Sequence, residues 1–314
     1  MKTLVTGGAG FIGSHLCESL IERGHEVWCV DNLYLGTEEN ISHCENSDRF
    51  HFEKFDVLDT ARLNSMFKNG NIDTVFHLAA NSDIQQGSVN HEIDLKLTFL
   101  TTYEVLQAMR RHGVNRIFFA GSSAIFGDTG TKKLHEDFGP ARPCSLYGAA
   151  KLAAEAYLSV FAKMFGFQTW ILRFPNVVGE RSTHGVVHDF IRRLKENPAR
   201  LEVLGNGLQR KPYLYVKDLV QAILLIVEKA KDPLAIYHAA GEGLTTVREI
   251  AEMVVDEMGL KGIPVVYQSA DCGWAGDVPF YQYDNRKITS LGFKPKYNST
   301  EAVRVAIQKT LGKK

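Results

Sequence analysis

Residues 6–13 read Thr-Gly-Gly-Ala-Gly-Phe-Ile-Gly, a glycine-rich segment whose spacing suits the binding of phosphate groups. The segment follows a short apolar run and opens a stretch with helical periodicity. Its glycines allow a tight turn, a close approach of the backbone to phosphates, and close packing of the helix on the strand. The helix start adds free N–H groups and the positive end of the helix dipole. The pattern predicts a dinucleotide site with contacts from Gly7, Gly10, Phe11, Ile12 and Gly13.

The residue at the end of the next apolar run supports a dinucleotide site and indicates which dinucleotide binds there. Residues 26–31 form a predicted strand that ends on Asp31, whose carboxylate can accept hydrogen bonds from the adenosine ribose hydroxyls. The same carboxylate would repel a 2′-phosphate, and the following Asn32 offers no positive charge to bind one. We therefore predict NAD as the cofactor and not NADP. Asp56 and Val57 follow the third predicted strand and would lie beside the adenine, unless Asp56 caps the next helix.

Tyr147 and Lys151 lie four residues apart at the start of a predicted helix, so their side chains share one helix face. A free phenol has a pKa near ~10 and is a weak base at neutral pH. A neighbouring ammonium and the positive nicotinamide ring both favour the phenolate and lower that pKa, which would make Tyr147 a general base. Ser122 ends a preceding predicted strand and can hydrogen-bond the same substrate hydroxyl. The three residues predict proton transfer at an alcohol.

Alternating strand and helix patterns in the first half of the chain predict the framework for these residues. Apolar, β-rich runs alternate with segments of helical periodicity, which predicts an α/β fold with a parallel sheet covered on both faces. Ligands of such a doubly wound (Rossmann) sheet bind at the carboxyl ends of the strands. The predicted strands are 2–6, 26–31, 50–54, 74–77, 116–120 and 169–174, and the predicted helices are 11–23, 61–68, 91–112 and 145–165.

This rhythm weakens after Pro175, where glycine, asparagine and proline become frequent. Segments 213–227 and 235–239 look like one more helix and one more strand that return to the first sheet, whereas 187–196 and 247–258 are predicted helices outside it. A chain of 314 residues is long enough for two lobes. We predict a Rossmann domain of residues 1–174 plus about 213–240, and a smaller C-terminal substrate-binding lobe of residues 175–212 and 241–314.

Composition and charge exclude several classes of function. Lys plus Arg equals Asp plus Glu at 36 each, so no net field attracts nucleic acid or an anionic membrane. No apolar stretch approaches the ~18 residues of a membrane span, and glycines interrupt the N-terminal apolar run, which disfavours a signal peptide. We expect a cytoplasmic protein without a metal site. Its cysteines lack C-x-x-C spacing and are expected to be scattered thiols, at Cys17, Cys29, Cys44, Cys144 and Cys272.

The ordered motifs resemble those of the extended short-chain dehydrogenase/reductase family, and within it the NAD-dependent nucleotide-sugar epimerases and dehydratases. The resemblance covers essentially the whole chain. It implies that Tyr147 is the base, that Lys151 tunes its pKa and anchors the nicotinamide ribose, and that Ser122 binds the hydroxyl. It also implies that Ala79 and Ala80 lie beside the cofactor. The motifs that carry it are the glycine loop, Asp31, His77-Leu78-Ala79-Ala80, Ser122 and Tyr147-x-x-x-Lys151.

The same resemblance implies a nucleotide-diphosphate sugar as the substrate. Asn176 would contact the diphosphate, and the backbone near Val203 would lie beside the base. Two arginines that clamp the diphosphate in epimerases are absent at the matching positions, which hold Lys211, preceded by Arg210, and Trp274. Lysine lacks the bidentate fork of arginine, and the tryptophan could stack on a ligand or pack within the lobe. The predicted substrate contacts are Ser123, Asn176, Val203, Arg210, Lys211, Tyr213, Trp274 and Asp277.

Other departures from the family pattern bear on the reaction. Dehydratases of this family carry an Asp-Glu pair directly after the residue that matches Ser122, because eliminating water needs an acid and a base. Here Ser123 and Ala124 occupy those places, which disfavours a 4,6-dehydratase. Asp94 stands where many relatives have an asparagine near the nicotinamide. Asp83 follows the fourth predicted strand and could line the sugar pocket, together with Gln85 and Gln86.

The resemblance therefore implies a nucleotide-sugar 4-epimerase. Tyr147 would remove the 4-hydroxyl proton while hydride passes to NAD⁺, and the transient 4-keto sugar would take the hydride back on its other face. A nucleotide-sugar 4-dehydrogenase or 4-keto reductase would use the same residues, and the sequence does not separate the two. A non-catalytic NAD-binding protein would be expected to lack Tyr147 or Lys151. A homodimer through helices 91–112 and 145–165 is expected, although their apolar positions equally suit packing on the sheet: Leu97, Leu100, Val105, Ala153, Tyr157 and Val160.

Overall fold

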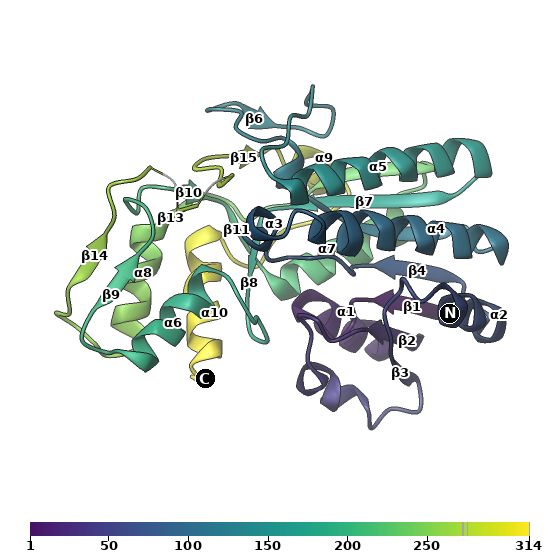
Figure 1. Cartoon of the computed structure of the whole chain (residues 1–314), viewed down its shortest axis with the longest axis horizontal. Coiled ribbons are helices and arrows are strands. Elements are labelled where there is room, and N and C mark those ends of the chain that lie inside the picture. The colour runs from purple at the N-terminus through teal and green to yellow at the C-terminus, as the bar shows by residue number, and fades with distance from the viewer. Residues whose placement is uncertain (272, 275, 314) are drawn as a thin grey trace.

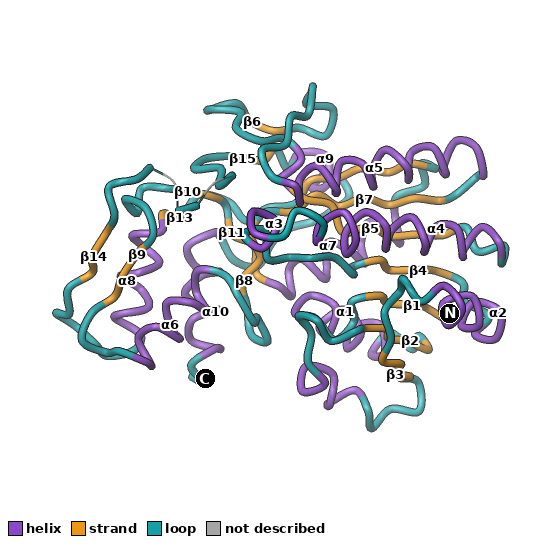
Figure 2. The backbone as a smooth tube through the Cα atoms, in the orientation of Figure 1, coloured by secondary structure: helices purple, strands orange, loops and turns teal. Residues whose placement is uncertain are grey.

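The computed structural model describes residues 1–271, 273, 274 and 276–313, so that Cys272 lies outside the described residues. Figure 1 shows a large sheet flanked by helices and, beside it, a smaller lobe that contains the C-terminus. Figure 2 shows that loops make up much of this smaller lobe, whereas the large sheet is built of regular strands and helices. The predicted doubly wound α/β fold with a smaller C-terminal lobe is confirmed.

The large sheet has seven parallel strands in the order β12-β7-β5-β4-β1-β2-β3. Its central strands are buried almost throughout, as expected for a parallel sheet covered on both faces. The strand order reverses between β1 and β4, where the carboxyl ends of the strands open a crevice for ligands. The strands are β1 (Lys2–Thr6), β2 (Glu26–Asp31), β3 (Phe50–Lys54), β4 (Thr74–His77), β5 (Arg116–Ser122), β7 (Gln168–Phe174) and β12 (Leu234–His238).

Helices cover both faces of this sheet. Successive strand residues point to opposite faces, so Val5 joins one hydrophobic cluster and Leu4 another. Leu16 of α1 and Leu219 of α7 pack in the cluster of Val5, and helices α2, α4 and α5 pack in the cluster of Leu4. The helices are α1 (Phe11–Glu22), α2 (Thr60–Gly70), α4 (Thr101–Arg111), α5 (Leu146–Phe165) and α7 (Val216–Lys229).

The smaller lobe is built around three helices that pack on one another, α6 (Val186–Glu196), α8 (Val247–Glu257) and α10 (Ser299–Thr310). Capping boxes at Thr246 and Asn298 define the starts of α8 and α10. Short strands pair within and beside this lobe: β8 (Asn176–Val178) with β11 (Tyr213–Tyr215), β9 (Leu201–Val203) with β14 (Val265–Tyr267), β10 (Arg210–Lys211) with β13 (Thr245–Thr246), and β6 (Lys133–Leu134) with β15 (Gln282–Tyr283). The remaining elements are η1 (Glu38–Cys44), α3 (Gln86–Val89), η2 (Leu95–Leu100), η3 (Ser123–Ile125) and α9 (Arg286–Ser290).

Two predicted helices differ from the structure at their beginnings. The helix predicted at 213–227 is wrong for its first three residues, which form β11 and pair in parallel with β8 before α7 begins at Val216. All three are buried, and two are tyrosines, which favour extended structure. The helix predicted at 91–112 begins with the π-helical turn η2 and continues as α4.

Three further findings concern the residues that the structure describes. None of their helices is long and apolar enough to cross a membrane. Within the same ranges, no group of three or more His, Cys, Asp and Glu side chains could hold a metal ion. Cys17, Cys29 and Cys44 are buried free thiols, and Cys144 is an exposed free thiol.

Candidate active site

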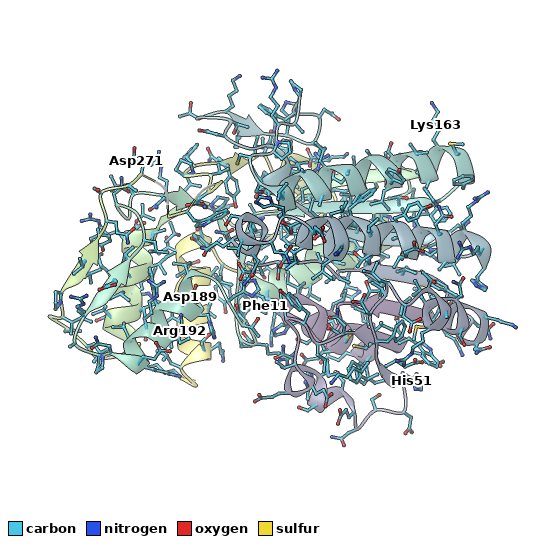
Figure 3. The ribbon with its side chains drawn as sticks, viewed as in Figure 1. Phe11, His51, Lys163, Asp189, Arg192 and Asp271 are labelled. Atoms are coloured by element: carbon cyan, nitrogen blue, oxygen red, sulfur yellow. The ribbon has the colours of Figure 1, made fainter. Side chains whose placement is uncertain are left out.

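A cleft of about 750 Å³ lies between the carboxyl ends of the sheet strands and the smaller lobe. Phe11 of α1 lines one side, and Asp189 and Arg192 of α6 line the other (Figure 3). All of the predicted cofactor, catalytic and substrate residues line this cleft except Ala79 and Arg210. The structure therefore brings together residues from β1, β2, β5, α5 and the smaller lobe, as ligand binding at the crevice of a doubly wound sheet requires.

The glycine loop is shaped by close backbone contacts. Gly7 has a φ of +71°, and a Cβ there would lie 2.7 Å from the Ala79 nitrogen. A Cβ on Gly13 would lie 2.1 Å from the Gly7 oxygen, so this glycine lets α1 pack on the turn. The backbone of Ala79 therefore packs directly against the turn of the glycine loop. The α1 N-terminus at Gly10 has no side-chain cap, which leaves its first N–H groups directed at the cleft for an anion.

Asp31 is positioned by backbone hydrogen bonds at the end of β2. Its Oδ2 accepts from the Ala9 amide at 3.0 Å, and its Oδ1 accepts from the Leu33 amide at 2.8 Å. Burial raises the pKa of Asp31, and these backbone donors oppose the rise because they stabilise the carboxylate. The carboxylate that we predict to bind the ribose therefore also connects the glycine loop to the loop after β2.

Asp56 has a role different from helix capping. Its Oδ2 accepts from Asn32 Nδ2 at 3.0 Å, and its Oδ1 accepts from the Leu58 amide at 2.9 Å. The residue that caps α2 is Asp59, whose side chain accepts from the Arg62 amide at 3.1 Å. The alternative that Asp56 caps the following helix is therefore wrong, and Asp56 remains in the cleft beside Asn32.

Lys151 is buried in the wall of the cleft that the large sheet forms. Its Nζ donates to the Ala120 carbonyl at 2.8 Å and lies 4.6 Å from the centre of the Phe119 ring and 5.7 Å from that of Tyr147. Burial lowers the pKa of Lys151 to about 7, and the charges of Glu155 and Asp94 oppose this decrease. The lysine therefore changes its charge in the physiological range.

Tyr147 and Ser122 meet where β5 ends and α5 begins. The Ser145 side chain caps α5 by accepting from the Gly148 amide at 3.1 Å, which fixes the first turn that carries Tyr147. The Tyr147 and Ser122 side chains both line the cleft, and the Ser122 Oγ accepts from the Ala124 amide at 3.1 Å. Burial raises the pKa of Tyr147 to about 12. The protein's own groups therefore do not by themselves lower this pKa as expected, because desolvation outweighs them.

The cation at the predicted diphosphate site already has a partner. Lys211 Nζ donates to Asp277 Oδ1 at 2.5 Å, and the two side chains are only 15% and 7% exposed. Asp277 Oδ2 also accepts from the Gly273 amide at 3.3 Å. Trp274 lines the same part of the cleft. A diphosphate bound here would therefore meet a lysine whose charge is already balanced by Asp277, and not the two arginines of the family pattern.

Several residues of the cleft lining were missed from the sequence, among them Tyr281 and Gln209. Tyr281 and Gln209 are buried and line the cleft, and Gln209 Oε1 has no hydrogen-bond partner among the described residues. Tyr281 follows Asp277 in an aromatic-rich stretch, a signal that could have indicated it. Asn176 and Tyr213 face each other in register across β8 and β11, and burial raises the pKa of Tyr213.

Arg210 is the predicted substrate residue that the structure places elsewhere. It is exposed, and its guanidinium lies 5.1 Å from the centre of the Phe280 ring, outside the cleft lining. Alternating residues of a strand point to opposite sides, so Lys211 enters the cleft while Arg210 does not. Of the three residues expected to line the sugar pocket after β4, Asp83 and Gln85 line the cleft, and Gln86, the first residue of α3, does not.

Comparisons with known proteins agree with this arrangement. Residues 3–240 match the NAD dependent epimerase/dehydratase family. A putative UDP-glucose 4-epimerase of Methanocaldococcus jannaschii is 30% identical over 307 residues, which cover 96% of this chain and 95% of that protein. The crystal structure of a Thermus thermophilus UDP-glucose 4-epimerase in complex with NAD is 31% identical, with a TM-score of 0.88 and 99% of both chains covered. A mouse dTDP-D-glucose 4,6-dehydratase is 27% identical over 315 residues, covering 98% of this chain and 88% of that protein.

The chain belongs to the NAD-dependent epimerase/dehydratase family. NAD is its cofactor, and the cleft fits this dinucleotide. The uncapped start of α1 suits the pyrophosphate, and the Asp31 carboxylate at the end of β2 suits a ribose without a 2′-phosphate. Because epimerases and dehydratases both match over nearly the whole chain, the family alone leaves the reaction type open.

Proposed function

We propose that this protein is a nucleotide-sugar 4-epimerase. The observation that carries the proposal is the convergence of Ser122, Tyr147 and Lys151 in the same cleft as the cofactor loop. Elimination of water would need an acid and a base after Ser122, where the cleft presents Ser123 and Ala124 instead. The residues thus suit oxidation and reduction at a sugar carbon better than dehydration.

The mechanism assigns one task to each of the three side chains. NAD, when bound, supplies the acceptor and then the donor for the hydride of the sugar carbon. Tyr147 takes the proton of the 4-hydroxyl and later returns it, while Ser122 orients that hydroxyl. Lys151 in its ammonium form stabilises the phenolate. Because burial raises the pKa of Tyr147 to about 12, the phenol gives up its proton only when positive charge lies close to it.

We propose that the nucleotide sugar extends from Tyr147 along the smaller lobe. The Rossmann part would comprise residues 1–174 with 213–240, and the substrate lobe the remainder. Asn176 would contact the diphosphate, the Val203 backbone the base, and Trp274 a base or sugar face. The diphosphate would compete with Asp277 for Lys211, since these two side chains form an ion pair in the cleft.

A panel of nucleotide sugars tests the epimerase proposal. We expect NMR to show interconversion of C4 epimers for at least one substrate, without lasting absorbance of NADH. Stoichiometric NADH together with released keto sugar would instead identify a 4-dehydrogenase or 4-keto reductase. NAD-loaded protein that converts no member of the panel would refute the proposal. Tyr147→Phe should retain NAD and lose turnover, because only the phenolic hydroxyl, which accepts and returns the proton, is removed.

We also propose a homodimer through the outer face of α5. Tyr157, Val160 and Met164 are exposed there by 42%, 48% and 68%, whereas Val105 of α4 is fully buried against the sheet. The Phe99 ring packs edge-on against Tyr157, with 5.1 Å between centroids, which continues the apolar surface. Exposed apolar patches of this kind mark contact surfaces. Light scattering should give the mass of a dimer for the wild type and of a monomer for Val160→Glu.

A further inference from the structure

Residues 179–185, which connect β8 to α6, form a strap that passes beside α1 (Figure 1). A Cβ on Gly179 would lie 3.5 Å from Phe11 Cε2, at the start of α1. Further along, Thr183 Oγ1 donates to the Leu35 carbonyl in the loop after β2 at 3.4 Å. The strap residues that line the cleft are Gly179, Ser182, Thr183, His184 and Gly185. The strap therefore spans the part of the cleft that suits the pyrophosphate and the ribose of NAD.

Two hydrogen bonds attach the strap to α1. Arg181 Nη2 donates to Glu18 Oε2 at 2.9 Å, and these two side chains are 23% and 31% exposed. His15 lies one turn before Glu18 on α1 and is buried, and its Nε2 donates to the Glu180 carbonyl at 3.1 Å. Neither Arg181 nor Glu18 lines the cleft. The helix whose start suits the pyrophosphate thus also holds the strap, through side chains outside the cleft.

The backbone conformation of Arg181 depends on these contacts. Arg181 has a φ of 67°, which is unfavourable for a residue other than glycine. Such a conformation persists where the surrounding structure holds it. On the other side, the Glu180 carboxylate accepts from the Tyr215 hydroxyl at 2.9 Å and lies 3.5 Å from Lys217 Nζ. Glu180 is therefore fixed between α1 and the start of α7.

The residues after Glu180 are held less firmly. Among the described residues, no backbone hydrogen bond joins Arg181–His184 to another segment. The strap ends at Gly185, whose φ of +100° favours glycine. Few backbone hydrogen bonds are a mark of segments that open locally. The side chains of Arg181 and Thr183 are therefore the contacts that keep this part of the strap on the α1 side of the cleft.

We propose that the strap is a gate for the cofactor, and that Arg181 is the positioning residue that keeps it closed. While Arg181 pairs with Glu18, the strap covers NAD, and NAD enters or leaves after this ion pair has opened. The proposal rests on NAD as the cofactor and applies to either type of reaction. It suits an epimerase in particular, because a cofactor that takes up a hydride and returns it must stay bound between the two steps.

The gate predicts a specific change in the exchange rates of the cofactor. Because Arg181 and Glu18 lie outside the cleft lining, breaking their ion pair destabilises the closed strap equally with and without NAD. The strap then opens more often in both states, so association and dissociation accelerate by the same factor and the Kd stays unchanged. We expect both rates to rise about fivefold, the upper end of the effect of a partly exposed ion pair.

The test variant is Arg181→Met, which removes the charge and keeps an unbranched side chain on the same backbone. The dissociation rate is measured by mixing NADH-loaded, full-length protein with excess NAD⁺ and following NADH fluorescence. The association rate is measured by stopped flow with cofactor-free protein. Glu18→Met removes the same ion pair from α1, so the test remains available if Arg181→Met does not fold. Arg304→Met is the matched control, because Arg304 pairs with Glu257 at 3.2 Å between α10 and α8, away from the cleft lining, and should keep both rates.

A double-mutant cycle tests whether the two side chains act through each other. Glu18→Met/Arg181→Met should exchange NADH no faster than either single variant, because all three lack the same ion pair. Arg181→Lys should recover part of the slow exchange, since it keeps the charge. Unchanged rates in both folded single variants, or additive effects in the double variant, would overturn the gate. Faster dissociation without faster association would also overturn it, because it would indicate a lost contact with the cofactor itself. These rates do not depend on turnover, so a wild type that converts no nucleotide sugar would refute the epimerase proposal alone.

Discussion

Replacing Arg173 by methionine should destabilise the protein strongly, because it leaves a buried carboxylate unpaired. Arg173 lies at the end of β7 and donates three hydrogen bonds to Glu155, two of them from Nε, and one to the Glu136 carbonyl at 2.8 Å. With the guanidinium gone, Glu155 at 5% exposure has neither water nor a cation to stabilise its charge. Removing one member of such a buried pair typically costs about 3–5 kcal/mol.

Urea unfolding at pH 7 measures this loss, and melting should show a decrease in Tm of roughly 10 °C for a chain of this size. The matched control is Arg192→Met. Arg192 also hydrogen-bonds both oxygens of a carboxylate, that of Glu196, but the two side chains are 50% and 62% exposed. Water replaces an exposed partner, so this control should change the unfolding free energy very little.

The double variant Arg173→Met/Glu155→Leu separates the charge from the packing. If the unpaired carboxylate causes the loss, removing Glu155 as well should restore much of the stability. The reasoning is refuted if Arg173→Met is no more harmful than Arg192→Met, or if the double variant is as unstable as the single one. In the single variant the freed charge of Glu155 should also raise the pKa of Lys151, which a pH titration of ¹⁵N-lysine-labelled protein followed by NMR detects.

Three further predictions concern the loop, the histidines and the thiols. Gly13→Ala should abolish NAD retention and lower the Tm, because its Cβ would lie 2.1 Å from the Gly7 oxygen; normal NAD content after gel filtration would contradict this. Burial lowers the pKa of His77 and His238 to about 3. Between about pH 3 and pH 6.5, both histidines therefore bind protons only in the unfolded protein. The unfolding free energy should therefore fall from pH 6.5 towards pH 4 by up to about 1.4 kcal/mol per pH unit and histidine; an equal slope in His77→Gln would argue against its contribution. Iodoacetamide should label Cys144, which lines the cleft, before the buried Cys17, Cys29 and Cys44, as read by peptide mass spectrometry; failure of nucleotide sugars to slow this labelling would place the substrate elsewhere.

Features set by local spacing could be predicted from the sequence. The turn of the glycine loop, the acid at the end of β2 and the shared helix face of Tyr147 and Lys151 each depend on residues close together in the chain. For the same reason the sheet strands were predicted with nearly their observed bounds. Tyr213, by contrast, lies in a stretch with helical periodicity, and it is extended because β8 offers a partner strand.

Pairings between distant segments could not be predicted, because a single sequence does not show which side chains meet. Lys211 and Asp277 were both expected to bind substrate, and their ion pair joins residues 66 positions apart. The pKa of Tyr147 was expected to fall beside an ammonium, but its direction depends on burial that only the packed structure shows. Likewise, Asp94 Oδ1 accepts from Asn81 while Oδ2 has no hydrogen-bond partner among the described residues, and this follows from how Asn81 and Gly87 pack around the carboxylate.

The two hydrogen bonds of Asp31 have a consequence for the evolution of this cleft. Its carboxylate holds the Ala9 amide on one side and the Leu33 amide on the other, and Leu33 has a φ of 62°, a conformation that is unfavourable for leucine. Replacing Asp31 to admit a 2′-phosphate would remove the acceptor of both amides at once. A lineage derived from this protein would therefore need compensating changes in the glycine loop and at Leu33, such as a glycine there, before its preference could move to NADP.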